Sequence, residues 1–362
     1  MWTKPYGSTG KKVSVIGFGG MRFANGDDID ANAEIVLHAY RKGITYFDTA
    51  PGYCKDRSEE IMGAAFRQMK PGTFFASTKC MKPDGGEFRR VLERSLKRLG
   101  LQKIHFHHIW CLLNPGEWGQ RKAGGAVAAA LKAKDEGLID HVVASTHMSG
   151  QDLHEVIADG VIEGVTLGYS AINFPYREAG VRAAGEAGLG VVTMNPLGGG
   201  LIPQNAERFD FLRGPADMSV VQAALRFNVS DPHVTCALVG FTTKQHVEEA
   251  VAAVQGFRPY GLAHVQWVRR HILESFADLC TGCGYCLPCP HGVPIPKLMD
   301  TYNMRLLGQD DKALAGRLKW HWGIAASEAA ACESCGQCEE ACTQHLPIMQ
   351  RLKEIAKLPH AK

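Results

Sequence analysis

The chain has 362 residues, of which 45% are hydrophobic, and its 40 Lys and Arg nearly balance its 37 Asp and Glu. A chain of this length suits one large α/β domain with a smaller appendage. The balanced charge, without long runs of one sign, argues against nucleic acid or a membrane surface as a partner. No signal peptide and no apolar run of roughly 18 residues is apparent, so we expect a cytoplasmic protein without membrane spans.

Short apolar runs alternate with amphipathic stretches through most of the first 265 residues. We predict eight strands, at 13–17, 45–48, 74–78, 104–110, 141–144, 165–167, 190–193 and 234–239. Helical patterns follow them at 30–42, 58–67, 87–99, 123–136, 151–158, 179–187, 219–228 and 243–254. This alternation favours a (β/α)8 barrel. A doubly wound sheet is the rival, but the GFGG after the first strand lacks the G-x-G-x-x-G spacing and no helix follows promptly.

In a barrel, chemistry belongs at the C-terminal ends of the strands. Asp48, Tyr53 and Lys79 lie at or just after the second and third predicted strands. A Lys ammonium would stabilise the tyrosine phenolate and lower its pKa, and an Asp would hold the Lys in place. A tyrosine tuned in this way can protonate a carbonyl oxygen while hydride reaches the carbon. The three residues are therefore candidates for catalysis in an oxidoreductase.

The sequence resembles the aldo-keto reductase family over roughly residues 8–255. The resemblance rests on GFGGMRF, FDTAPGY followed by SEEIMG, STK, the LGL before the fourth strand, NPLGGG and GFTTKQHVEEA. It implies a TIM barrel that binds NAD(P)H without a Rossmann fold and uses an Asp, Tyr, Lys, His tetrad. Asp48, Tyr53 and Lys79 match the first three members of that tetrad.

The fourth member of the tetrad is replaced, because Trp110 stands where the family pattern has His. Strand alternation puts Trp110 and His108 on the inner face, with His108 roughly 7 Å deeper, and His105 and His107 on the outer face. We predict that the outer two are packed or hydrogen-bonded core histidines, while His108 and His147 stay open as replacements for the missing group. Within the family, changes at this position accompany altered reactions, including reduction of carbon–carbon double bonds.

The cofactor region also departs from the family pattern. A Ser-Asn pair becomes Ser145 and Thr146, a stacking aromatic residue becomes Met194, and a basic residue near the 2′-phosphate becomes Thr242. The positions that the resemblance assigns to the cofactor are Ser145, Thr146, Met194, Pro196, Leu197, Gly240, Thr242 and Glu249. NAD(P)H binding is expected, with the choice between NAD and NADP open.

Eight of the twelve cysteines fall between Cys280 and Cys342, which in a reducing compartment indicates metal rather than disulfides. The run from Cys332 has the C-x2-C-x2-C-x3-C spacing of bacterial ferredoxins, and the run from Cys280 is one residue shorter. Such closely spaced thiolates suit a cubane better than two zinc ions. In two-cluster ferredoxins the fourth Cys of each run binds the other cluster. We therefore predict two [4Fe–4S] clusters, one on Cys280, Cys283, Cys286 and Cys342 and the other on Cys332, Cys335, Cys338 and Cys289.

Helical patterns at 295–307 and 311–320 indicate an α-helical ferredoxin-like domain, so we predict domains at 1–265 and 266–362. The clusters either transfer electrons, which implies an electron-transfer partner, or hold the tail together. The main hypothesis is an NAD(P)H-dependent oxidoreductase that acts on a small carbonyl or enone compound with Tyr53 as proton donor. The alternatives are elimination or isomerisation with Tyr53 and Lys79 as acid and base, and a nicotinamide- or redox-sensing module with little turnover.

Overall fold

The computed structural model describes residues 1–148, 150–213, 218–275, 278–280, 284–342 and 345–359. The chain divides into two compact units. The first comprises Met1–Ile172 and Glu178–Gly261, and the second comprises Asn173–Arg177 and Leu262–Lys362. Within the described ranges, no helix has the length and apolar character that crossing a bilayer requires.

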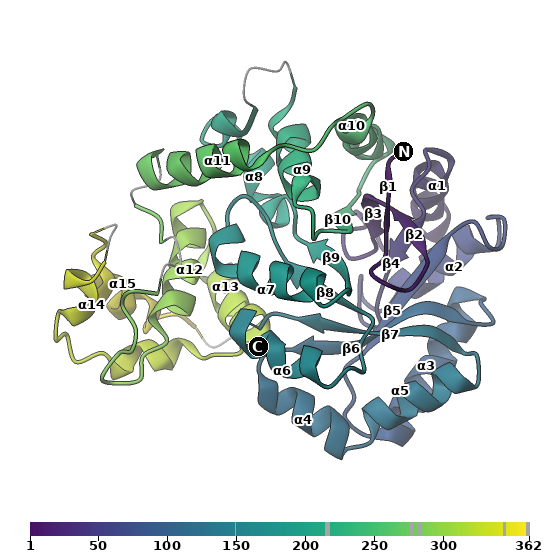
Figure 1. The fold of residues 1–362 in the computed structure, drawn as a ribbon, viewed down its shortest axis with the longest axis horizontal. Coiled ribbons are helices and arrows are strands. Elements are labelled where there is room, and N and C mark those ends of the chain that lie inside the picture. The colour runs from purple at the N-terminus through teal and green to yellow at the C-terminus, as the bar shows by residue number, and fades with distance from the viewer. Residues whose placement is uncertain (149, 214–217, 276–277, 281–283, 343–344, 360–362) are drawn as a thin grey trace. The chain divides into compact units, whose positions relative to one another are not determined.

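The first unit contains a closed barrel in which every neighbouring pair of strands is parallel (Figure 1). The strands are β3 (Ile16–Gly19), β4 (Tyr46–Asp48), β5 (Phe75–Cys80), β6 (Ile104–Leu112), β7 (Ile139–Thr146), β8 (Gly164–Gly168), β9 (Gly190–Met194) and β10 (Cys236–Gly240). They pair in chain order, and β10 closes the ring against β3. The predicted (β/α)8 barrel is confirmed, and an open doubly wound sheet is excluded.

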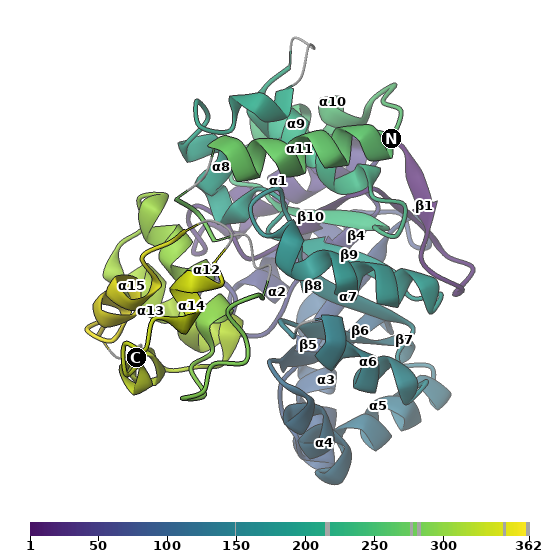
Figure 2. The same ribbon diagram turned by 60° about the vertical axis from the view of Figure 1, so that its left-hand side comes forward.

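Helices follow the strands and cover the outside of the barrel, as α3 and α5 do beside β5, β6 and β7 (Figures 1 and 2). The helices are α1 (Ile29–Arg41), α2 (Ser58–Phe66), α3 (Gly85–Leu99), α4 (Pro115–Ala123), α5 (Ala126–Asp135), α6 (Gly150–Ala158), α7 (Phe174–Glu186), α8 (Leu201–Gln204), α9 (Val220–Ser230) and α10 (Lys244–Val254). Polar residues cap several of them. Ser219 and Gln222, for example, form a reciprocal capping box at the start of α9.

The first predicted strand, 13–17, is wrong as a single element. Its beginning belongs to β2 (Lys12–Ser14), which pairs antiparallel with β1 (Thr3–Pro5), and the barrel strand β3 starts only at Ile16. Ser14 explains the break, because its hydroxyl donates to the carbonyl of Ile16 at 2.7 Å and accepts from the N–H of Thr45 at 2.9 Å. Such side-chain bonds compete with the regular ladder.

The predicted helix 123–136 is confirmed over Ala126–Asp135, which is α5, but it begins too early, because Ala123 ends α4 and two glycines separate the helices. Gly125 has φ of +88°, in the left-handed region that only glycine enters without strain, and it separates α4 from α5. The start of α4 carries a helix signal that our prediction missed. Asn114 accepts a hydrogen bond from the N–H of Glu117, and Pro115 occupies the first turn.

Side chains fill the end of the barrel where the strands begin. Tyr6, which follows β1, is completely buried and stacks on Phe106 with ring centroids 4.0 Å apart. Tyr46, Val192 and Cys236 belong to the same buried cluster. The interior is therefore a packed core at this end, which leaves the C-terminal ends of the strands for a site.

All regular elements in the described part of the second unit are helical, as predicted. Its elements are α11 (Leu262–Ser275), α12 (Ile295–Leu306), α13 (Asp311–Arg317), a π-helical turn (Leu318–Trp322), a 3₁₀ segment (Ala326–Ala331), α14 (Gln337–Glu340) and α15 (Ile348–Ile355). A core that includes Leu298 of α12, Leu314 of α13 and Leu352 of α15 packs against several cysteines. The loops that carry these cysteines therefore pack against a hydrophobic core.

Candidate active site and iron–sulfur ligands

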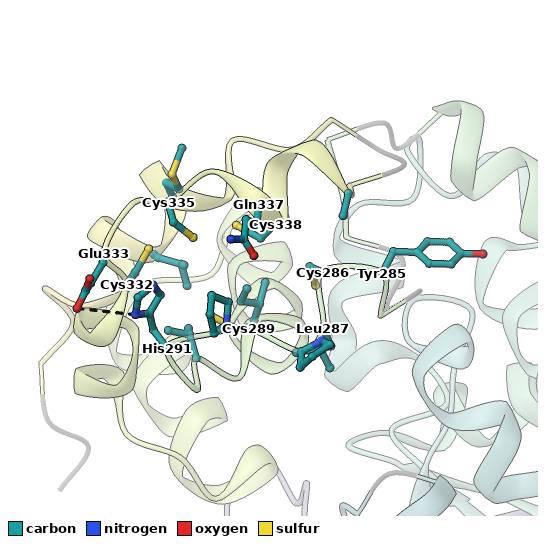
Figure 3. Close-up of a pocket in the computed structure, with 17 residues that line it drawn as sticks. Tyr285, Cys286, Leu287, Cys289, His291, Cys332, Glu333, Cys335, Gln337 and Cys338 are labelled. Atoms are coloured by element: carbon teal, nitrogen blue, oxygen red, sulfur yellow. Dashed lines mark ion pairs between the residues drawn. The ribbon is translucent and has the colours of Figure 1, made fainter.

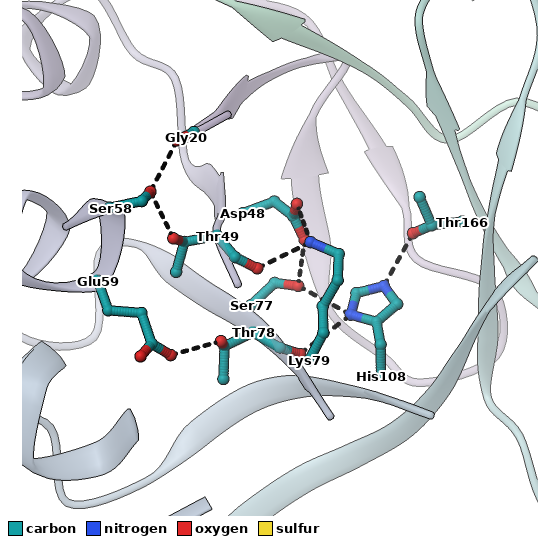
Figure 4. A network of polar contacts seen from close by, with 10 residues as sticks. All are labelled: Gly20, Asp48, Thr49, Ser58, Glu59, Ser77, Thr78, Lys79, His108 and Thr166. Carbon is teal, nitrogen blue, oxygen red and sulfur yellow. Dashed lines mark hydrogen bonds and ion pairs between the residues drawn. The ribbon is translucent and has the colours of Figure 1, made fainter. Parts of the chain in front are cut away.

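Asp48 and Lys79 meet at the C-terminal ends of the adjacent strands β4 and β5. Lys79 forms an ion pair with Oδ1 of Asp48 and donates a second hydrogen bond, 2.8 Å long, to the carbonyl of Thr49 (Figure 4). Ser77 donates to the other carboxylate oxygen at 2.7 Å. Both charged side chains are only 3% exposed, so the pair is shielded from competing water.

Tyr53 lies beside this ion pair and beside Trp110. The Nζ of Lys79 is 5.0 Å from the centroid of the Tyr53 ring. The Trp110 ring meets the Tyr53 ring edge-on, with centroids 5.6 Å apart and an interplanar angle of 88°. The structure therefore brings together the four residues that the sequence proposed as the catalytic group: Asp48, Tyr53, Lys79 and Trp110.

Three consecutive left-handed residues follow Tyr53, namely Cys54, Lys55 and Asp56, with φ values of 51°, 55° and 66°. Non-glycine residues adopt this conformation at a cost of roughly 1–3 kcal/mol each, and such strain gathers at functional sites. Asp56 holds the turn, because its carboxylate accepts from the N–H of Gly52 at 2.8 Å and pairs with Arg98 at 2.8 Å. No sequence pattern indicated this turn, which sets the direction in which the chain leaves Tyr53.

The expected direction of the Tyr53 pKa is wrong. Burial raises this pKa, and the nearby Lys79 charge lowers it only in part, so that the net pKa lies above its ordinary value. Asp48 explains why Lys79 has so little effect, because the carboxylate offsets the ammonium charge. For Lys79 itself, burial lowers the pKa, but Asp48 and Tyr53 together outweigh it and the net pKa is raised. Tyr53 is therefore protonated and Lys79 charged at neutral pH.

Trp110 lies next to an irregularity in β6. The pairing of β6 with β7 shifts between Ile109 and Leu112, and Cys111 has a φ of 58°. Such a bulge re-aims the side chains around it. Trp110 keeps the inner face that alternation predicted, in contact with Tyr53, while burial raises the pKa of the Cys111 thiol to about 11.

The outer histidines of β6 behave as predicted. His107 is completely buried against Phe88 of α3, with ring centroids 4.9 Å apart. Nδ1 of His105 accepts a hydrogen bond from the N–H of Ala76 at 3.0 Å. His108 lies inside the barrel and is also completely buried. His147 directly follows β7, and its backbone N–H donates to the carbonyl of Leu112 at 2.9 Å.

The predicted nicotinamide residues lie on β7, β9, β10 and the segments after them. The Thr146 hydroxyl is committed to structure, because it donates to the carbonyl of Leu112 and accepts from the N–H of Met148, both at 2.9 Å. Thr242 bonds His246 at 3.0 Å, and Glu249 accepts from the cap residue Ser219 at 2.5 Å. The others are Ser145 and Pro196, both buried, Met194 and Leu197, partly exposed, and Gly240, exposed.

Arg22 is a candidate cofactor residue that sequence reasoning missed. It follows β3 and packs against Gly240, where a Cβ atom would lie 2.7 Å from Arg22 Cγ. Its Nη2 atom lies 3.9 Å from the Cβ position of Gly199, one of three successive glycines with positive φ. An exposed guanidinium beside glycine-rich backbone suits a phosphate group. The signal was present in the sequence as the Arg of GFGGMRF.

The second unit gathers cysteines from two separated segments around one cavity of about 180 Å³ (Figure 3). Its lining includes Cys289, Cys332, Cys335 and Cys338, together with Cys286. Left-handed residues at Ser334 (φ 57°) and Gly336 (φ 83°) turn the chain between the cysteines of the second run. None of the described cysteines is paired in a disulfide. Cys283, another predicted ligand, lies outside the described residues.

These thiols are arranged for a cluster with several irons. Among the residues that the structure covers, no three His, Cys, Asp or Glu side chains are grouped closely enough to hold one metal ion. A [4Fe–4S] cluster differs in that each thiolate binds its own iron, and the thiols therefore surround a larger volume. The four cysteines predicted for the second cluster all line the cavity, and they fit that requirement.

Cys280 belongs to the other predicted cluster, and polar bonds hold its backbone. Its N–H donates to the side chain of Asn303 at 2.8 Å, and its carbonyl accepts from the same amide at 2.9 Å. The hydroxyl of Tyr176 donates to that carbonyl at 3.1 Å. Cys342, assigned to the same cluster, is buried in the core of this unit.

Comparison with known proteins accounts for both units. Residues 15–260 match the model of the aldo/keto reductase family, and residues 279–347 match that of a 4Fe-4S dicluster domain. The chain belongs to the aldo/keto reductase family. The predicted combination of an aldo-keto reductase barrel with a C-terminal iron–sulfur domain is thereby confirmed.

Similar proteins include characterised reductases and dehydrogenases. L-galactose dehydrogenase of Arabidopsis thaliana is 27% identical over 297 residues, which cover 71% of this chain and 89% of that enzyme. NADH-specific methylglyoxal reductase of Escherichia coli strain K12 is 25% identical over 243 residues, covering 59% and 72%. The holo form of the aldo-keto reductase AKR11C1 from Bacillus halodurans superimposes with a TM-score of 0.65 at 20% identity, covering 75% and 96%, which supports the fold alone.

Proposed function

We propose that the barrel catalyses NAD(P)H-dependent reduction of a small carbonyl or enone compound, with Tyr53 as the proton donor. The observation that carries this proposal is the position of Tyr53 beside the buried ion pair of Lys79 and Asp48. Membership of the aldo/keto reductase family supports the same chemistry.

In the proposed reaction, a bound nicotinamide supplies hydride to the electrophilic carbon of the substrate. Tyr53 donates the phenolic proton to the developing oxyanion, and the charge of Lys79 stabilises the phenolate left behind. Asp48 keeps Lys79 in place. Trp110 has no titratable group and therefore cannot donate the proton. We propose that it lines the pocket beside Tyr53 and donates its indole N–H to a substrate oxygen.

We propose that the cofactor residues predicted from the sequence hold the nicotinamide nucleotide. Arg22 is added to them as a contact for a phosphate group. Gly240 lets the Arg22 side chain pack closely against the backbone, and the open space at Gly199 lies next to the Arg22 guanidinium, where a phosphate group would bind. The choice between NADH and NADPH stays open, because no basic residue stands at Thr242.

For the second unit, we propose two [4Fe–4S] clusters with the ligand sets predicted from the sequence. Each cluster would exchange one electron at a time. We propose that they exchange single electrons with a partner protein. The cavity lined by Cys289, Cys332, Cys335 and Cys338 supports the assignment of one ligand set.

Elimination or isomerisation is less well supported. That chemistry needs a neutral base at the site, whereas the pKa of Lys79 is raised and its ammonium donates to Asp48 and to the Thr49 carbonyl. A sensing role does not account for the ion pair, because burying two charged side chains costs desolvation free energy.

The test uses anaerobically purified full-length protein. NADH or NADPH oxidation is measured with methylglyoxal, and NAD(P)+ reduction is measured with L-galactose, the compounds named for the similar enzymes. Tyr53→Phe should lower kcat by roughly 100-fold or more, the scale of a general acid. Tyr40→Phe is the matched control, because the Tyr40 hydroxyl bonds Thr73 on the outside of the barrel. Full activity of Tyr53→Phe would remove Tyr53 from its proposed role.

Electron transfer is tested on the same preparation. NADH should bleach the visible absorbance of the clusters if the nicotinamide exchanges electrons with them. Unchanged absorbance, together with reduction of the clusters by dithionite, would show that the two redox centres are not connected.

A further inference from the structure

His108 lies at the centre of a buried chain of hydrogen bonds that crosses the interior of the barrel (Figure 4). Its Nε2 atom is 2.8 Å from the Thr166 hydroxyl on β8. Its Nδ1 atom is 3.2 Å from the Ser77 hydroxyl and 3.2 Å from the Thr78 carbonyl on β5. Ser77 in turn donates to Oδ2 of Asp48 at 2.7 Å. The chain therefore joins β8 to the carboxylate that holds Lys79.

The chemistry of the partners sets the direction of every bond in this chain. A carboxylate only accepts, so the single proton of the Ser77 hydroxyl goes to Asp48. The Ser77 oxygen must then accept from His108, and the Thr78 carbonyl can also only accept, so Nδ1 carries the proton. Burial keeps the pKa of His108 well below its ordinary value, and the Lys79 charge adds to this effect. The ring is therefore neutral, and Nε2 accepts from Thr166.

We propose that His108 is a positioning residue for the reaction: through Ser77 it orients Asp48, and through Asp48 it orients Lys79 beneath Tyr53. Thr166 donates to Nε2 and so supports the same tautomer. This inference rests on the proposed function of Tyr53 and Lys79. It also answers the question of the missing tetrad histidine, because both ring nitrogens of His108 are already bonded within the barrel and neither is available to a substrate oxygen.

Replacement of His108 by Asn or by Gln distinguishes the role of Nδ1 from that of Nε2. Asn places an amide N–H close to the position of Nδ1, whereas Gln places its amide close to the position of Nε2. His108→Asn should keep the donor to Ser77 and retain kcat within about threefold. His108→Gln and His108→Leu should lower kcat by roughly 10- to 100-fold, the scale seen when hydrogen-bond partners behind a functional group are removed. The KM should stay within about threefold in all three, because none touches the pocket.

A second measurement needs neither a substrate nor a variant. Nitrogen-15 NMR of the histidine rings in the full chain should show His108 as the neutral tautomer with the proton on Nδ1, without titration between about pH 5.5 and 9.

Particular results would overturn the proposal. These are a proton on Nε2, titration of His108 in that range, an unchanged kcat in His108→Leu, or equal kcat values for His108→Asn and His108→Gln. Failure of the proposed function is recognised separately, because Tyr53→Phe would then keep its activity while the tautomer of His108 could still be as stated.

Discussion

Replacing His107 with leucine should make the protein more stable in acid. His107 is completely buried, and neither ring nitrogen has a hydrogen-bond partner among the described residues. Burial lowers its pKa to about 3. An unfolded histidine titrates near about 6.5, so between these two pH values the unfolded chain binds a proton that the folded chain excludes. Stability is therefore lost as pH falls below the unfolded pKa.

The magnitude follows from the two pKa values. At pH 5 the excluded proton costs wild type about 2 kcal/mol of unfolding free energy, and at pH 7.5 it costs about 0.1 kcal/mol or less. His107→Leu removes this cost. The variant also loses a buried polar group without partners, which raises the free energy of unfolding by about 1–3 kcal/mol at every pH. The lost ring contact with Phe88 lowers that free energy, again at every pH. The diagnostic quantity is thus the change between the two pH values.

Urea unfolding of wild type and variant, followed by circular dichroism through the barrel transition, measures this quantity. The stability difference between variant and wild type should be about 2 kcal/mol larger at pH 5 than at pH 7.5. His154→Leu is the control, because it makes the same replacement at a histidine that is exposed on α6 and not buried. An equal difference for His107→Leu at both pH values would refute the reasoning, since His107 would then bind its proton in the folded state.

Three further perturbations test other parts of the structure. Lys79→Met should cost about 3–5 kcal/mol in thermal or urea unfolding because it leaves Asp48 buried and unpaired, whereas Lys103→Met, at a half-exposed pair, should cost under about 1 kcal/mol. Lys4→Met should cost about 1.5–3 kcal/mol by the same measurement, because Lys4 Nζ donates to three backbone carbonyls at 2.6–3.0 Å. Cys335→Ser should halve the iron content per chain under the two-cluster proposal, and an unchanged iron content would exclude Cys335 as a ligand.

Much of the candidate site could be predicted because it depends on local patterns. Asp48 and Lys79 follow apolar strands, and the carboxyl ends of neighbouring parallel strands must meet, so their encounter required only the order of the elements. Alternation along β6 placed His107 outside and Trp110 inside for the same reason. The spacing of the second cysteine run likewise predicted a set of thiols around one cavity.

Other features could not be predicted from local patterns. The break after Ser14 depends on a bond to Thr45, and the division of α4 from α5 depends on the backbone conformation of Gly125. The left-handed turn that follows Tyr53 is stabilised by the ion pair between Asp56 and Arg98, and Arg98 lies on α3. The bond to Thr45 and the ion pair with Arg98 join groups that are distant in sequence and meet only in the folded barrel.

By itself, the sequence determined the order of strands and helices, the residues at the strand ends and the thiols available for clusters, because these follow from periodicity and spacing along the chain. Only the tertiary structure decided that the Tyr53 pKa rises and that His108 is bonded to Thr166 across the barrel. The physical reason is that desolvation and hydrogen-bond direction are summed over all neighbours in space, and most neighbours of a buried side chain are distant in sequence.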